Sequence, residues 1–417
     1  MARRVGKSIS RHRGCSATGV STSSAVEPFG VSPSGHDATT VPKQSTTVSV
    51  VRKPSDLAEL ITDWEELASN ALEPNPFYEH WMFLPALESL APREAICCVL
   101  VWIRDAADGR RKLGALFPFH RPAAYNGMPI LALQSYRHAH WLLCTPLVRR
   151  GWARACLEAL MDWFCHDGEG ASLIELRYWP CEEGIFSALA DVLRRRQQFA
   201  IATDQFSRAL LVKRGEWAQS MPALPREFNK CLPRKERRLR EQGGVAHLEL
   251  KPGEDAAPWI AGFLALEASG WKGKRGSALA CSEGNRRFAL KTMSEAARRG
   301  RLLMAGIDFD GRPISRCINF TAGVGSFAFK TAFDESFAQY SPGVMAEVDN
   351  LKLFHRLAGV LWMDSLTEPD NDMMNRLWNG RRLFQTLLIG TGAWGELAAS
   401  GLPLARWAKR RVAAFLR

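Results

Sequence analysis

The chain has 417 residues, of which 46% are hydrophobic and 24% are charged, with 55 lysines and arginines against 43 aspartates and glutamates. These proportions are those of a soluble globular protein, and they exclude wholesale disorder, collagen-like and coiled-coil sequences. A chain of this length is expected to form two or three domains. No run of about 18 apolar residues occurs, so the sequence predicts no membrane-spanning helix.

The net charge of +12 is concentrated in three segments. Residues 1–50 carry +4, residues 224–243 carry +4 and residues 376–417 carry +7, which leaves the rest of the chain at −3. A nearly neutral core argues against one broad nucleic-acid-binding face. The pattern indicates local anion sites and charged chain ends instead.

The ten cysteines are scattered, and most lie within apolar stretches. They form no Cys-x-x-Cys pair and no Cys/His group with zinc spacing, so we expect no metal. Scattered buried thiols indicate a reducing compartment. Residues 1–14 are basic, but no apolar signal-peptide core follows them. We therefore expect a cytoplasmic protein.

The first folded domain is expected over residues 49–215, after a tail. Residues 1–48 are rich in Ser, Thr, Gly, Pro and Val and predict a disordered basic tail. The apolar spacing then predicts helices at 56–67 and 81–90, strands at 95–104 and 112–119 around an Asp-Gly turn, a helix at 152–166 and a strand at 172–179.

A second domain, over residues 216–400, repeats this order. We expect strands at 301–309 and 313–321 around another Asp-Gly turn, a strand at 326–332, a helix at 342–358 and a strand at 360–366. Sequence identity between the halves is negligible, so the inference rests on element order. The order predicts two copies of one α/β unit.

The chain lacks the commonest nucleotide and hydrolase motifs, but one helix start is suited to an anion. No P-loop, dinucleotide fingerprint or Gly-x-Ser-x-Gly elbow occurs. Tyr340, Ser341, Pro342 and Gly343 precede or open the helix expected at 342–358. Ser341 suits an N-cap, Pro342 suits the first helical position, and Gly343 lets a ligand approach the backbone. Such a start binds phosphate or pyrophosphate, and the alternative is an ordinary cap without a ligand.

Three residues near apolar elements are further candidates. Lys330 lies inside an apolar strand, so it must reach water, a carboxylate or a ligand. Trp271 and Lys272 follow an apolar helix that ends at Gly270; they could cover a ligand and meet its carboxylate or phosphate. The alternatives are an edge-strand lysine that reaches solvent and a helix C-cap with a packed tryptophan.

Charged residues at two more places are candidates for binding or catalysis. Arg234, Arg237 and Arg238 share one face of a helix and could contact phosphates or an acidic partner, although a solvated helix laced by its own glutamates is equally consistent. Asp364 ends an apolar strand. A carboxylate there can serve as a base or bind a substrate amine, and the alternative is an acid at a strand end without such a role.

Five segments of the second half form a recognisable series. They read FLALEASGWKG at 263–273, DGRPI at 310–314, KTAFD at 330–334 and YSPG at 340–343, together with the basic stretch from Leu232. In this order they resemble bacterial GNAT-superfamily acyltransferases of the subgroup named for the cellulose-biosynthesis protein CelD, which is related to the Fem aminoacyltransferases. The resemblance covers about residues 225–370.

The resemblance implies an α/β fold with a tandem pair of GNAT-like domains, each a mixed, mainly antiparallel sheet flanked by helices. It further implies an acyltransferase that moves an acyl group, with acetyl-CoA as co-substrate, to an amine or hydroxyl of a small molecule or a polysaccharide precursor. The usual GNAT pyrophosphate loop, Arg/Gln-x-x-Gly-x-Gly/Ala, is matched here only by residues 339–343.

The resemblance also suggests roles for the candidate residues. Asp364 or Asp334 would accept the proton of the nucleophile, Tyr340 would protonate the leaving thiolate, and Lys330 would belong to the catalytic set. Backbone N–H groups near Phe329 would stabilise the oxyanion. The residues expected to bind the donor are Ser341, Pro342, Gly343 and Phe329. The residues expected to bind the acceptor are Trp271, Lys272, Arg234, Arg237 and Arg238.

Two alternatives stay open. A Fem-like enzyme would take its acyl group from aminoacyl-tRNA, the basic helix after Leu232 would contact the RNA, and binding would weaken steeply with salt. A degenerate GNAT-like scaffold would bind a partner without catalysis, and the missing Gly-rich loop favours it. We expect no nucleic-acid partner other than tRNA in the first of these alternatives.

The last segment, residues 401–417, is expected to be a basic amphipathic helix. It would either lie on an anionic membrane face, which would place the protein at the periphery of the inner membrane, or pack against the preceding domain.

Overall fold

The computed structural model describes residues 45–90, 95–104, 109–182, 184–215, 226–378 and 380–401. Most of the predicted tail (1–48) and nearly all of the predicted C-terminal helix (401–417) therefore lie outside the described residues. The first strand begins at Thr46, so the end of the range expected to be disordered is ordered in a sheet. None of the described helices has the length and apolarity that a membrane crossing requires.

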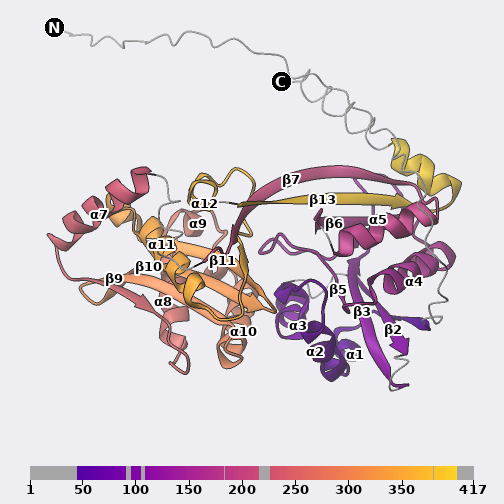
Figure 1. Cartoon of the computed structure of the whole chain (residues 1–417), viewed down its shortest axis with the longest axis horizontal. Coiled ribbons are helices and arrows are strands. Elements are labelled where there is room, and N and C mark those ends of the chain that lie inside the picture. The colour runs from indigo at the N-terminus through magenta and orange to yellow at the C-terminus, as the bar shows by residue number, and fades with distance from the viewer. Residues whose placement is uncertain are drawn as a thin grey trace, which may run out of the picture. The chain divides into compact units, whose positions relative to one another are not determined.

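The first half of the chain runs from indigo to magenta in Figure 1. Its strands are β1 Thr46–Val51, β2 Ile96–Arg104, β3 Arg111–His120, β4 Ala132–Ser135, β5 Leu147–Val148, β6 Leu173–Pro180 and β7 Ala200–Val212. The helices are α1 Pro54–Ala58, α2 Ile61–Ser69, α3 His80–Ser89, α4 Ala153–His166 and α5 Ile185–Arg195, with the 3-10 turns η1 Pro76–Tyr78 and η2 Gly168–Gly170.

The second half has the remaining described elements. Its strands are β8 Val245–Glu249, β9 Leu302–Phe309, β10 Arg312–Ala322, β11 Gly325–Phe333, β12 Trp362–Asp364 and β13 Gly380–Gly390. Its helices are α7 Arg226–Arg240, α8 Ala257–Ser269, α9 Trp271–Lys274, α10 Glu283–Arg298, α11 Pro342–Arg356 and α12 Asp372–Leu377, with the 3-10 turns η4 Leu279–Cys281 and η5 Glu335–Tyr340.

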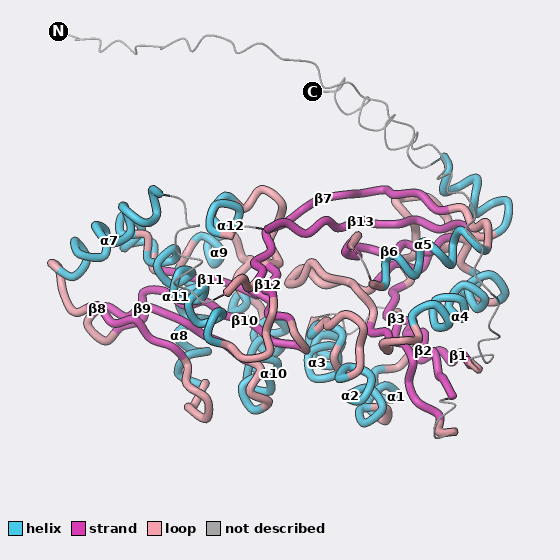
Figure 2. Tube along the Cα trace, viewed as in Figure 1, coloured by secondary structure: helices cyan, strands magenta, loops and turns pink. Residues whose placement is uncertain are grey.

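One mixed sheet, mainly antiparallel, runs through both halves in the order β1-β2-β3-β4-β6-β13-β7-β12-β11-β10-β9-β8, with β5 paired to β3. The last strand of the second half, β13, lies between β6 and β7 of the first half. The last strand of the first half, β7, pairs in turn with β12 of the second half. The two halves therefore exchange strands, which Figure 2 shows as the long pair β7 and β13. The predicted fold class, a repeated α/β unit with a mainly antiparallel sheet flanked by helices, is confirmed.

Apolar side chains on both faces of the strands hold the helices in place. In the first half, Val99 and Phe117 face Leu157 of α4, and their neighbours Cys98 and Leu116 pack on the other face with α2 and α3. Strands covered on both faces read as continuous apolar runs, which is why the hairpin at 95–119 was visible in the sequence. In the second half, α8 and α10 cover one face of the strands, and α11 covers the other.

Several elements differ from the sequence prediction. The helix expected at 56–67 is two helices, α1 and α2, and the strand expected at 360–366 is reduced to Trp362–Asp364. The strands β7 and β13 and the helix α10 were not predicted. β7 mixes exposed polar with buried residues over 13 positions, and both of its partner strands, β12 and β13, belong to the second half of the chain.

A fully buried ion pair joins the two halves at the strand exchange. Arg208 of β7 donates to both carboxylate oxygens of Asp364 of β12, with Nε–Oδ1 and Nη2–Oδ2 distances of 2.6 and 2.8 Å, and neither side chain is exposed. Arg208 also donates to the carbonyl oxygen of Leu142, and its guanidinium lies 4.0 Å from the centre of the Phe384 ring of β13. One side chain thus connects β7, β12, β13 and the loop that precedes β5.

Replacing Asp364 with Asn is expected to lower the free energy of unfolding by about 3–5 kcal/mol, because it leaves the buried Arg208 without its charge partner. Urea unfolding at neutral pH would measure the loss. Glu241→Gln, which removes an exposed ion pair with Arg237, is the control and should cost less than about 1 kcal/mol. A variant of Asp364 that is fully stable would show that the pair does not hold the halves together.

Candidate active site

A β-bulge in β11 marks the centre of the candidate site. Lys330 pairs with Ile318 and Ala328 pairs with Asn319, so Phe329 is an extra residue that has no cross-strand partner in β10. A bulge re-aims side chains and leaves backbone groups out of the ladder. Here it places two successive side chains on one face of the sheet: Phe329 packs with α8, and Lys330 reaches Glu267 of the same helix.

The sheet opens directly beside this bulge. β12 pairs with β11 only from Gly325 to Phe327, where Phe327 lies opposite Asp364. From Ala328 to Phe333, β11 bonds to β10 but has no strand partner on its other edge among the described residues. The bulge therefore lies at the start of an opening between two parallel strands, where backbone N–H groups can meet a ligand.

The start of α11 lies at the far end of β11, across η5. Ser341 takes a left-handed conformation (φ 58°), and its hydroxyl accepts a hydrogen bond from Lys235 of α7 at 2.7 Å. Arg376 of α12 lies on the same side, with its guanidinium 5.3 Å from the centre of the Phe228 ring. Together these groups line a pocket formed by Phe228, Cys231, Leu232, Lys235, Ser341, Val344 and Arg376. Two cations at a helix start form a favourable place for phosphate oxygens.

Two details of this helix start differ from expectation. Ser341 occupies the N-cap position, but its side chain makes no capping bond, because the hydroxyl faces Lys235. Gly343 is buried, and a side chain at this position would come within 3.1 Å of the Phe333 ring. The glycine therefore allows α11 to pack closely on β11, which explains it without a ligand. Pro342 does open the helix, as predicted.

A buried carboxylate and two lysines form a polar cluster on the α8 side of the bulge. Glu267 Oε1 lies 3.4 Å from both Lys272 Nζ and Lys330 Nζ, and Glu267 Oε2 accepts a 2.8 Å bond from the N–H of Leu279. The Glu267 side chain is 0% exposed, and that of Lys330 is 14% exposed. Burial lowers the pKa of Lys330, and Glu267 partly opposes this effect. A small pocket between α8, α9 and the end of β11 leads to Glu267 and Lys272.

The first half places two histidines near this cluster. His138 and His140 lie in the loop between β4 and β5 with their ring centres 4.9 Å apart, and His140 Nε2 is 3.1 Å from Oδ1 of Asn285 in α10. Burial, with a smaller contribution from nearby cations that include Lys330, lowers the pKa of each imidazole to about 4. Both imidazoles are therefore neutral at pH 7. Residues from both halves thus meet at one polar site.

The candidate acids and Tyr340 do not join the polar cluster. Asp364 is buried at the closed end of the opening, and Arg208 occupies both of its oxygens. The base role expected for Asp364 is corrected here, since its geometry is that of a structural partner. Asp334 caps η5 through Ser336, and Tyr340 packs near Phe337 at the end of that turn.

The residues expected to bind the acceptor separate into two groups. Lys272 belongs to the polar cluster, and Trp271 is 51% exposed at the rim of its pocket. Arg234, Arg237 and Arg238 are exposed on α7, and no described pocket includes them. The structure therefore does not bring these three arginines to the polar cluster.

Sequence reasoning missed Glu267, His140, Asn285, Lys235 and Arg376 as site residues. Glu267 had a signal, because it is a single carboxylate inside an apolar helix, where an acid needs a partner. Lys235 lies in the basic stretch from Leu232 that the sequence singled out, but it was not chosen there. His140, Asn285 and Arg376 had no signal, since the sequence does not show which distant segments meet. Within the described residues, no group of His, Cys, Asp or Glu is placed to hold a metal ion.

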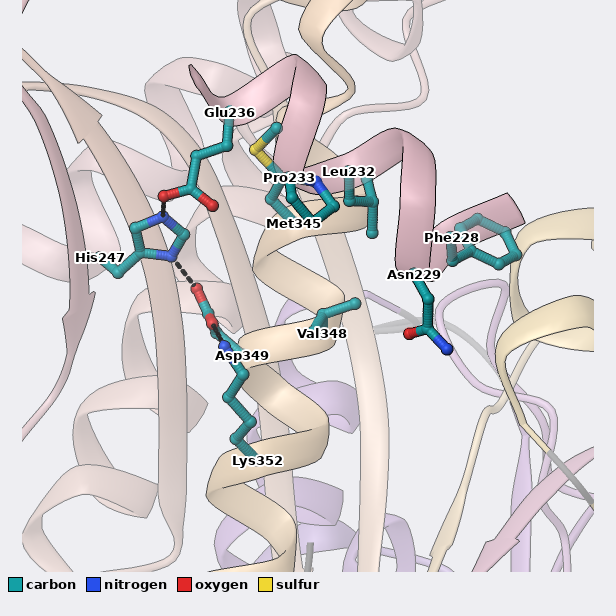
Figure 3. A pocket seen from close by; sticks show the side chains of 10 residues that line it. All are labelled: Phe228, Asn229, Leu232, Pro233, Glu236, His247, Met345, Val348, Asp349 and Lys352. Atoms are coloured by element: carbon teal, nitrogen blue, oxygen red, sulfur yellow. Dashed lines mark hydrogen bonds and ion pairs between the residues drawn. The ribbon is translucent and has the colours of Figure 1, made fainter. Parts of the chain in front are cut away.

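A second pocket lies along α11, between α7 and β8 (Figure 3). Its apolar lining is Phe228, Leu232, Pro233, Met345 and Val348. At one end His247 lies between two carboxylates: Nδ1 meets Asp349 of α11, and Nε2 lies 3.2 Å from Glu236 Oε1 of α7 (Figure 3). The hydrogen bond to Asp349 raises the pKa of His247, with Glu236 adding to the effect while burial and Lys352 oppose it.

We expect the imidazole of His247 to titrate above pH 6.5, because the charged ring donates to both carboxylates. Its contribution to stability is then fully present below pH 6.5 and is lost as the pH rises through the raised pKa. An NMR titration of the imidazole protons measures the pKa, and Asp349→Asn should lower it. An imidazole that titrates at or below pH 6.5 would contradict the geometry.

Comparison with known proteins gives one family match over part of the chain and a likeness in fold. The family described as Acetyltransferase (GNAT) domain matches residues 226–370, which contain β11, its bulge and the start of α11. The crystal structure of FemX is 9% identical to the chain, covers 79% of this chain and 95% of its own, and has a TM-score of 0.51. At this identity the likeness shows the fold alone.

Two further solved structures have TM-scores under 0.5, and no curated protein matches the chain. A conserved protein of unknown function from Bacteroides thetaiotaomicron VPI-5482 is 12% identical, with 79% and 97% of the two chains covered and a TM-score of 0.49. A tandem GNAT protein from the clavulanic acid biosynthesis pathway is 13% identical, with 83% and 99% covered and a TM-score of 0.40. The family match is thus confined to residues 226–370, within the second half of the chain.

Proposed function

We propose that the chain is an acyltransferase that moves an acyl group, with acetyl-CoA as donor, to an amine or hydroxyl of a small molecule or a polysaccharide precursor. The observation that carries the proposal is the bulge at Phe329, which lies beside an opening in the sheet. At the far end of β11, Lys235 of α7 and Arg376 of α12 line the pocket at the start of α11. This combination offers one place for a reacting carbonyl and another for phosphates. The family match over residues 226–370 supports the reaction class.

The donor would lie along the open edge of β11. Its phosphates would meet Lys235, Arg376 and the first N–H groups of α11, while Ser341 and Pro342 shape that end. The thioester carbonyl would accept a hydrogen bond from a backbone N–H at the bulge around Phe329. Fixed N–H donors stabilise the oxyanion of a tetrahedral intermediate without having to reorganise during the reaction.

The acceptor would enter on the α8 side, where the polar cluster lies. Its nucleophilic atom attacks the thioester carbonyl carbon, and the proton that it loses passes to a neutral base. His140 fits this role because it is a neutral imidazole in the same cluster as Lys330. If its Nε2–H donates to Asn285 Oδ1, the lone pair of Nδ1 is free to accept the proton. Tyr340 or solvent would then protonate the leaving thiolate.

A second candidate donor is aminoacyl-tRNA. The exposed face of α7, with Arg234, Arg237 and Arg238, favours it because phosphate contacts need accessible cations. Under this alternative the polar cluster would keep its role, and only the donor would change. We also propose, from the sequence alone, that the chain belongs to the CelD-like subgroup and that residues 401–417 make a peripheral membrane contact.

Isothermal titration with acetyl-CoA tests the donor. We expect micromolar binding, weakened about ten-fold by Arg376→Gln and by Lys235→Gln, because each removes a charge-assisted contact to phosphate. Lys230→Gln, at an exposed position of the same helix as Lys235, is the matched control and should bind as the unchanged protein does. If acetyl-CoA does not bind and tRNA binds in a salt-sensitive manner, aminoacyl-tRNA replaces acetyl-CoA as the donor. If neither acetyl-CoA nor tRNA binds, a non-catalytic scaffold is favoured.

His140→Gln is expected to lower the rate of acetyl transfer about 100-fold while acetyl-CoA still binds, because the variant lacks the proton acceptor. Release of the CoA thiol measures the rate, with an acceptor found by screening amines. His166→Gln removes an exposed histidine of α4 and serves as the control. An unchanged rate in His140→Gln would exclude His140 as the base.

A further inference from the structure

The polar cluster holds more positive charge than it can balance. Glu267 is the carboxylate that faces both Lys272 and Lys330, and both ammonium groups stand 3.4 Å from the same oxygen, Oε1. Its other oxygen is occupied by the N–H of Leu279. The Lys272 side chain is 24% exposed and that of Lys330 only 14%, so Lys330 has the smaller contact with water. Partly buried ammonium groups are stable only with adequate partners, and one shared carboxylate leaves one charge uncompensated.

The neighbouring groups do not supply the missing negative charge. Glu335 also lines the pocket that leads to Lys272, but its oxygens accept bonds from the N–H of Trp271 at 2.6 Å and from Lys274 Nζ at 2.9 Å. The imidazoles of His138 and His140 are neutral at pH 7. The carbonyl oxygen of Thr331 is a distant acceptor for Lys272, at 3.5 Å. Next to His138, the indole N–H of Trp141 is fully buried and has no hydrogen-bond partner within the part of the chain that the structure describes. The cluster thus offers more donors than acceptors.

We propose that Lys272 and Lys330 hold an anionic group of the acceptor, a carboxylate or a phosphate, next to the atom that is acylated. This proposal rests on the proposed function and adds the class of acceptor: an amine or alcohol that carries an anion near its nucleophile. The pocket that leads to Lys272 opens between α8, α9 and β11. It shares no lining residue with the pocket at the start of α11, so the anion is distinct from the phosphates of the donor.

The exposed aromatic ring beside this pocket extends the same recognition. The Trp271 ring centre lies 5.9 Å from Lys272 Nζ and 5.1 Å from the Arg275 guanidinium. It offers a flat apolar face at the entrance, next to further positive charge. A site built around charges discriminates strongly against an analogue without the matching group, because its own charges are then left unpaired.

The test is titration of the full chain with acetate and with inorganic phosphate at constant ionic strength, with acetamide as the neutral analogue of acetate. We expect at least one anion to bind and acetamide not to bind. Lys330→Gln should weaken anion binding about ten-fold or more, whereas Lys330→Arg should retain most of it. Lys272→Gln, at a more exposed site, should weaken anion binding similarly. This second variant replaces Lys330→Gln in the test if Lys330→Gln fails to fold. Lys291→Gln, at a surface lysine paired with Glu88, is the control.

Each outcome separates this proposal from the proposed function. Stronger binding of acetate assigns a carboxylate, and stronger binding of phosphate assigns a phosphate. If anion binding responds to Arg376→Gln but to neither lysine variant, the ion lies at the start of α11. This result would overturn the proposal that Lys272 and Lys330 hold it. The absence of any anion binding would also overturn it, whatever acetyl-CoA does. Anion binding without acetyl-CoA binding would leave the pocket standing and count against acetyl-CoA as donor.

Discussion

The buried pair of Arg208 and Asp364 is the interaction on which the rest of the structure depends. It lies where β7 of the first half pairs with β12 of the second, and Arg208 also holds the Leu142 carbonyl of the loop that carries His138 and His140. Asp364 is also the last residue of β12 that pairs with β11. The same pair that fixes the strand exchange therefore fixes where the sheet opens and where the two histidines arrive. A buried ion pair of this kind costs desolvation, which its bidentate geometry offsets.

This arrangement makes the site a product of both halves. The second half supplies the bulge at Phe329, Lys330, Glu267 and the start of α11, while the first half supplies His140. Strand exchange keeps these parts in register, because β13 cannot leave the first half without breaking its pairing with β6 and β7. The GNAT match over residues 226–370 thus covers the bulge, Lys330 and the start of α11, while Arg376 and the loop that carries His140 lie outside it.

The sequence alone was sufficient to predict the repeated unit and the start of a helix at Pro342. Both predictions use apolar periodicity and turn residues, which determine local structure. The sequence also singled out Lys330 and Lys272, since a lysine near apolar elements needs a partner. It failed for Asp364, whose partner Arg208 lies 156 positions away in a strand that was not recognised. The resemblance suggested that backbone N–H groups near Phe329 stabilise the oxyanion, but the sequence could not show the bulge, which depends on the register with β10. Long-range pairing was the missing information in each case.

A structure of the protein with bound acetyl-CoA tests the central claim most directly, that the opening beside the bulge receives an acyl donor. The account predicts the thioester oxygen about 3 Å from a backbone N–H at Phe329, with the phosphates at Lys235 and Arg376 and the acetyl group directed toward His140 and Lys330. Acetyl-CoA bound elsewhere, with the edge of β11 left empty, would contradict it.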